Sequence, residues 1–61
     1  MIFTAEQKLR IVRREIERRQ KIYPNRIMTG RMKQSEADWE IAVMEAIEQD
    51  YDMAAKKERL L

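Results

Sequence analysis

Hydrophobic residues between positions 37 and 55 recur at the spacing of an α-helix. Each residue turns a helix by about 100°, so steps of three and four residues place side chains on one face. The first such face holds Ala37, Ile41, Met44, Ile47, Tyr51 and Ala55. A second apolar face, roughly opposite, holds Trp39, Ala42, Val43, Ala46 and Met53. A helix that is apolar on two sides is normally covered on both, so this helix is expected to have two packing partners.

The N-terminal part of the chain predicts a helix over about residues 4–23. Thr4 and Gln7 form a Thr-x-x-Gln capping box, in which each side chain accepts a hydrogen bond from the other residue's backbone N–H. Pro24 disfavours a helical conformation for the residue before it, so the helix is expected to stop near Tyr23. Its apolar residues follow one narrow stripe, made by Ala5, Leu9, Val12, Ile16 and Tyr23.

A separate short turn of helix is predicted over about residues 24–29. Proline suits the first position of a new helix. Gly30 suits the position just after a helix end, where glycine adopts a left-handed conformation at least cost. Ile27 and Met28 in this turn are expected to cover the end of a hairpin.

The second helix is expected over about residues 34–57, with two possible starts. Either Ser35 is its N-cap with Asp38 at the third helical position, or Lys33 is a poor N-cap with Glu36 there. Two antiparallel helices then form an all-α hairpin, a single domain over residues 1–61.

The size of the chain favours self-association. A 61-residue chain buries only about 60% of its unfolded surface and is marginal alone. It has no cysteine for a disulfide. One helix with a narrow stripe can cover only one face of its neighbour. We therefore predict a homodimer, most simply a four-helix bundle, in contact through the face of Trp39, Ala42, Val43, Ala46 and Met53. The alternative is that a foreign partner docks on this face.

Charge is divided between the two helices. Residues 1–33 hold ten Lys and Arg and three Glu, for +7, whereas residues 34–61 hold three Lys and Arg and eight Asp and Glu, for −5. Attraction between antiparallel helices explains part of this division. The cations on the far side of the first helix and in the turn are the candidate partner-binding residues: Arg10, Arg14, Arg18, Lys21, Arg26 and Arg31.

We predict that the partner is another protein, and an acidic one would match the basic face of the first helix. The alternative is a nucleic acid bound by the basic face of the first helix. A helix–turn–helix reader does not fit, because its second helix enters the major groove and here that helix is acidic. A small anionic ligand between Tyr23, Arg26 and Arg31 is a further alternative to packing of Tyr23 beneath Pro24.

Enzyme chemistry has little support in the sequence. The chain has no histidine, no cysteine and a single glycine, so the commonest general base and a glycine-rich phosphate loop are both missing. We predict no catalytic residue, no metal site and no cofactor. No apolar stretch is long enough to span a membrane, and the first residues lack the pattern of a signal peptide. The expected location is the cytoplasm.

Short motifs along the chain resemble small helical proteins encoded by bacterial phages and prophages. They are F-T-x-E-Q-K at residues 3–8, R-R-E-I at 13–16, Y-P at 23–24, G-R-M at 30–32 and A-D-x-E-I-A-V-M at 37–44. The sequence departs from the pattern at Lys33, where Ser or Thr is expected, and at Ile27, where an aromatic residue is expected. The resemblance implies a phage-related setting, in which binding of a host protein is a common activity. It carries over no binding or catalytic residue.

Overall fold

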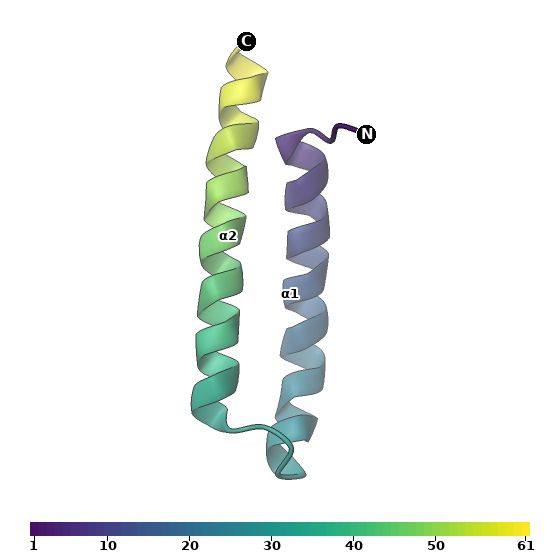
Figure 1. The fold of residues 1–61 in the computed structure, drawn as a ribbon, viewed down its shortest axis with the longest axis vertical. Helices are drawn as coiled ribbons and strands as arrows, with labels where there is room; N and C mark the ends of the chain where they lie inside the picture. The colour runs from purple at the N-terminus through teal and green to yellow at the C-terminus, as the bar shows by residue number, and fades with distance from the viewer.

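The computed structural model describes all 61 residues, Met1 to Leu61, and contains two helices and no strand (Figure 1). Helix α1 spans Ala5–Met28 and helix α2 spans Gln34–Leu60. The helices run antiparallel and pack against each other, which confirms the predicted all-α hairpin. The molecule is a rod with extents of 48 × 19 × 17 Å. The dimeric four-helix bundle stays a prediction.

The N-terminus of α1 is capped from both ends of the chain. The Thr4 hydroxyl accepts from the Gln7 N–H at 3.1 Å, and the Thr4 N–H donates to the Gln7 side chain at 2.9 Å. The predicted capping box is therefore confirmed. In addition, the Glu58 carboxylate accepts from the Ala5 N–H at 3.1 and 3.2 Å. A negative group at this end is favourable because helix N-termini carry partial positive charge. The last turn of α2 is thereby tied to the first turn of α1.

The prediction that the first helix stops at Tyr23 is wrong. Helix α1 continues through Pro24 to Met28, and no separate turn of helix over residues 24–29 exists. Proline inside a helix removes one N–H from the hydrogen-bond ladder and its ring crowds the carbonyl four residues earlier, so packing of the preceding turn against α2 has to offset this cost. Tyr23 is buried against α2, and its hydroxyl donates to Glu40 Oε1 at 2.9 Å. These contacts outweigh the local preference of the residue before proline.

Gly30 has the left-handed conformation that was predicted for it, although it follows the end of the long helix α1 rather than a separate short turn. Its φ of +74° lies in the left-handed region. The Gly30 N–H donates to the Ile27 carbonyl at 3.1 Å, and the Arg31 N–H donates to the Arg26 carbonyl at 2.9 Å. This pair of bonds is a Schellman motif. Met28 does not cover the hairpin end and is exposed, because the continued helix turns it away from α2.

Helix α2 begins after Lys33, which makes no side-chain capping bond. Of the two starts considered, the poor Lys33 cap is the one observed, and Ser35 as N-cap is wrong. Glu36 therefore occupies the third helical position. The helix runs to Leu60 rather than to about residue 57.

The core between the helices is thin. Only six of the 61 residues are buried, and none of them is polar. They include four members of the predicted α1 stripe and both ends of the first face of α2, so the predicted packing of these faces is confirmed. The buried residues are Ala5, Leu9, Ile16 and Tyr23 of α1 and Ala37 and Ala55 of α2.

The chain exposes more surface than a compact protein of its mass. Its accessible surface is 5221 Å², whereas a folded monomer of 7.4 kDa is expected to expose about 4,200 Å². Its radius of gyration is 14.3 Å, against about 10 Å for a compact domain of this length. A single hairpin therefore leaves on the order of 1,000 Å² uncovered that a compact fold would bury.

Candidate interaction surfaces

Ion pairs join the two helices along one side of the hairpin. Arg13 contacts Glu48 at 3.2 Å and Asp52 at 3.4 Å, and Arg19 contacts Glu40 at 3.8 Å. These pairs account for part of the charge division between the helices. Each of them is partly exposed, so each contributes little to stability. They neutralise Arg13 and Arg19 but leave the outward cations of α1 free.

Hydrogen bonds, ion pairs and burial shift the pKa values of several side chains of the hairpin. A hydrogen bond from Arg19 at 2.9 Å lowers the pKa of Glu15. An ion pair with Lys56 at 3.0 Å lowers the pKa of Asp52. Burial, and then the hydrogen bond to Glu40, raises the pKa of the Tyr23 hydroxyl. All of these groups lie in ion pairs or hydrogen bonds of the hairpin.

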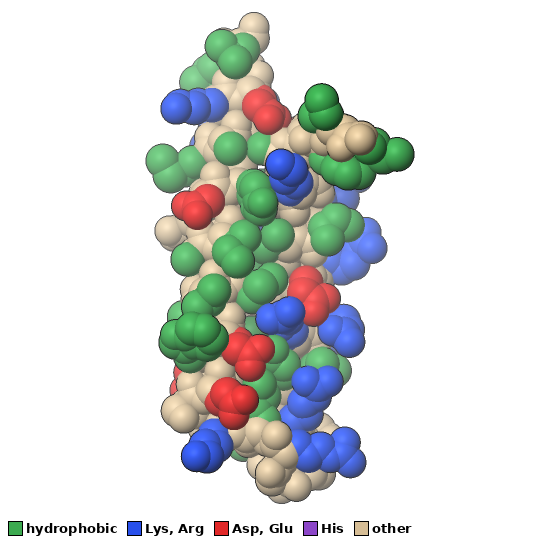
Figure 2. All heavy atoms as spheres, viewed as in Figure 1, with side chains coloured by type: hydrophobic (Ala, Val, Ile, Leu, Met, Phe, Trp, Pro, Cys, Tyr) green, Lys and Arg blue, Asp and Glu red, His purple; other side chains and the backbone are tan.

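The second apolar face of α2 is uncovered in the single chain. Trp39 is 67% exposed, Met53 69% and Val43 38%, and Ala42 and Ala46 between them are also exposed. Figure 2 shows hydrophobic side chains along almost the whole of α2, while Lys and Arg gather along the α1 edge. We call this set of five residues the outer face of α2. The structure places all five on the surface, with no element of the chain over them.

A shallow hollow of about 490 Å³ adjoins the C-terminal end of this outer face. Met53 and the largely exposed Leu60 form part of its lining. The remaining lining residues are Asp50, Ala54, Lys56 and Lys57. The hollow thus combines apolar side chains with one carboxylate and two lysines.

The predicted partner-binding cations lie on the surface of α1 and the turn. Arg18 pairs with Glu15 of its own helix at 3.1 Å. Arg26 lies 5.9 Å from the centre of the Tyr23 ring. The others form no ion pair with any carboxylate: Arg10, Arg14, Lys21 and Arg31. The structure therefore places a largely unneutralised cationic surface on the side of α1 that faces away from α2.

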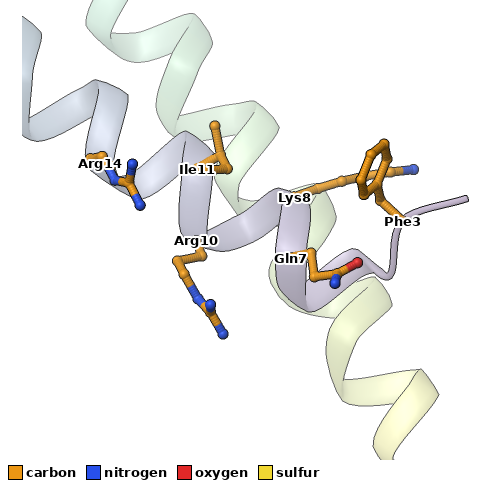
Figure 3. Close-up of a pocket in the computed structure, with 6 residues that line it drawn as sticks. All are labelled: Phe3, Gln7, Lys8, Arg10, Ile11 and Arg14. Carbon is orange, nitrogen blue, oxygen red and sulfur yellow. The ribbon is translucent and has the colours of Figure 1, made fainter. Parts of the chain in front are cut away.

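Two apolar side chains interrupt this cationic surface near the N-terminus. Phe3 is 52% exposed and Ile11 55%. They line an open hollow of about 450 Å³ together with Gln7, Lys8, Arg10 and Arg14. In Figure 3, Phe3 and Lys8 occupy one end of this hollow and Arg14 the other. Sequence reasoning missed this site, although Ile11 stood apart from the buried stripe and was the available signal.

The turn offers little to a small anionic ligand. Tyr23 is buried, and its hydroxyl is engaged by Glu40. Its ring is therefore not free to stack on a nucleotide, although Arg26 and Arg31 are exposed nearby. Tyr23 is thus a packed residue, but its hydrogen-bond partner is Glu40 of α2, which the sequence did not predict.

Neither helix contains a stretch that is both long and apolar enough to cross a membrane. No group of three or more acidic side chains is placed to hold a metal ion. The main exposed features of the hairpin are the outer face of α2 and the cationic surface of α1. In comparisons with known proteins, no family model, no curated protein and no solved structure matches this chain.

Proposed function

We propose that this chain is a small non-enzymatic binding protein that acts through protein–protein contacts as a homodimer. The observation that carries the proposal is the uncovered outer face of α2, with Trp39 and Met53 each about two-thirds exposed. Contiguous apolar surface of this kind marks a site of association. A phage-related setting, implied by the resemblance of the sequence motifs, stays a prediction.

The amount of surface that the hairpin leaves exposed favours a second copy of the chain as the partner that covers this face. Each partner in a stable complex of standard size buries about 800 Å². The hairpin exposes on the order of 1,000 Å² more than a compact monomer of its mass. Dimerisation would cover a comparable area and would thicken a core that holds only six buried residues.

The cationic surface of α1 then serves the binding of a different partner, an acidic protein. Arg10 and Arg14 supply charge that no carboxylate of the chain neutralises, and Phe3 and Ile11 supply apolar contact beside it. Interfaces combine such an apolar centre with a polar rim. An acidic segment that carries one or two apolar side chains matches both properties.

A nucleic acid is the competing partner, since unpaired cations also bind phosphates. The hollow beside Arg10 and Arg14 counts against it, because its exposed apolar residues, Phe3 and Ile11, offer nothing to a duplex backbone. We therefore favour the acidic protein.

Binding of defined probes separates the two partners. The probes are a labelled acidic peptide with two apolar side chains, a peptide of equal charge without them, and a short DNA duplex. We expect the first peptide to bind best. Binding should weaken in the Arg10→Ala/Arg14→Ala variant and in the Phe3→Ala/Ile11→Ala variant. It should not weaken in Met28→Ala, which removes an exposed apolar side chain outside this hollow. Tighter binding of the duplex, falling steeply with salt, would instead establish the nucleic-acid alternative.

A further inference from the structure

We infer that the two copies pair through antiparallel α2 helices, with Trp39 of each copy seated in the hollow at Met53 of the other. The inference rests on the self-association proposed above and adds its orientation and its central contact. It follows from three features of the outer face of α2: the positions of Trp39 and the hollow, the placement of charge, and the small residues between them.

The projecting side chain and the hollow are placed symmetrically on one surface. Trp39 lies seven residues before Ala46, and Met53 lies seven residues after it. Seven residues are nearly two turns of helix, so all three side chains point to the same side, about 10 Å apart along the axis. A two-fold axis through Ala46 therefore brings each Trp39 onto the Met53 of the other copy. A symmetric dimer needs such a self-complementary surface.

The charges at the two ends of α2 select the antiparallel orientation. Glu36 lies exposed near the beginning of the helix, and Lys57 lies exposed near its end. Neither forms an ion pair within the chain. Antiparallel helices centred on Ala46 place Glu36 of one copy near Lys57 of the other. Parallel helices would instead place Glu36 beside Glu36 and Lys57 beside Lys57, and like charges repel.

The hollow suits an indole ring. Met53 and Leu60 of its lining supply apolar contact, and Lys57, which also lines it, can lie over the face of the ring. Methionine sulfur and lysine ammonium groups both interact favourably with aromatic rings. Ala42 and Ala46 at the centre of the face are small, so the two helices can approach closely there.

Single cysteines test the orientation cleanly, because the chain has none of its own. The sites are Ala46 at the proposed axis and Ser35 and Leu61 at the two ends of the helix, all of which are exposed. A short thiol-to-thiol cross-linker is applied to each variant at a concentration where wild-type protein is dimeric by light scattering. Products are separated on a denaturing gel.

The antiparallel pair predicts that Ala46→Cys cross-links to itself. Ser35→Cys should not, because two copies of residue 35 would lie about 30 Å apart. A mixture of Ser35→Cys and Leu61→Cys should give a mixed product. Self-linking of Ser35→Cys, or the absence of any product from Ala46→Cys and from the mixture, would overturn the inference. A wild-type chain that is monomeric by light scattering would overturn the proposed dimer itself. A dimeric wild-type chain with the wrong cross-links would overturn only the antiparallel orientation, so the two failures are distinguishable.

Discussion

Replacement of Trp39 by alanine is the sharpest perturbation of the proposed dimer. The side chain is 67% exposed in the single chain, so its removal should change the stability of an isolated hairpin by no more than about 0.5 kcal/mol. In the dimer the same side chain would be covered. Trp39→Ala should therefore have little effect if the hairpin is monomeric and a large effect on dimer stability if it is dimeric.

The size of the effect follows from the surface that the dimer would cover. An aromatic side chain buries about 150–250 Å² in total. About two-thirds of the Trp39 side chain is exposed in the single chain. After the area that alanine would also bury is subtracted, the dimer covers on the order of 100 Å² more surface per copy with tryptophan than with alanine. At about 25 cal/mol per Å², this is ~2.5 kcal/mol per copy and ~5 kcal/mol per dimer. The dissociation constant of Trp39→Ala should then rise by more than about 10³-fold.

Sedimentation across a concentration series measures this dissociation constant. Met28→Ala is the matched control, since Met28 is 82% exposed but lies away from α2. Trp39 is also the only tryptophan, so its fluorescence in wild-type protein should shift to the red on dilution. An unchanged dissociation constant for Trp39→Ala, with emission independent of concentration, would refute the role assigned to Trp39.

Three further predictions concern the hairpin itself. Gly30→Ala should lower the free energy of unfolding by about 1 kcal/mol per chain, because φ is +74° and an L-residue is strained there. Lys33→Ser should raise it by about 1 kcal/mol, since serine completes a capping box with Glu36. The free energy of unfolding should also fall as pH rises above 10. Folding raises the pKa of the Tyr23 hydroxyl above its usual 10.0, so the stability that this group contributes is complete below pH 10. That contribution is lost at higher pH, as the hydroxyl ionises beside Glu40. Chemical denaturation followed by circular dichroism measures all three.

Each of these predictions has its own control. A β-carbon at Gly30 would meet no atom within 4 Å, so the loss in Gly30→Ala reflects backbone conformation alone, and Gly30→Asn should lose less. Ser35→Ala should leave the free energy of unfolding unchanged, because Lys33 is the N-cap. If Ser35→Ala instead lowered the free energy of unfolding and Lys33→Ser did not raise it, the N-cap would be Ser35. Tyr23→Phe should remove the alkaline loss, and an unchanged loss in that variant would assign it to another group.

Local chemistry made much of the fold predictable. The Thr4–Gln7 capping box and the left-handed Gly30 each depend on residues within a few positions of each other. The buried stripe of α1 follows from helical periodicity, and Leu9 and Ile16 within it are indeed buried. Features of this kind can be deduced from the sequence because neighbours along the chain determine them.

Contacts between distant residues account for what the sequence did not predict. Helix α1 passes through Pro24 because Tyr23 is held against Glu40, 17 residues further along the chain. The bond from Ala5 to Glu58 spans 53 residues. The hollow between Phe3 and Ile11 exists only once the N-terminal lead lies against the first turns of α1. Each depends on an arrangement in space that periodicity alone does not specify.

The mass of the wild-type protein in solution tests the central claim most directly. Light scattering coupled to size-exclusion chromatography, repeated over a range of loading concentrations, reports this mass independently of the rod shape. The uncovered outer face of α2 predicts a species of twice the 7.4 kDa chain mass that dissociates on dilution. A fully helical, cooperatively folding species of 7.4 kDa at every concentration would contradict it.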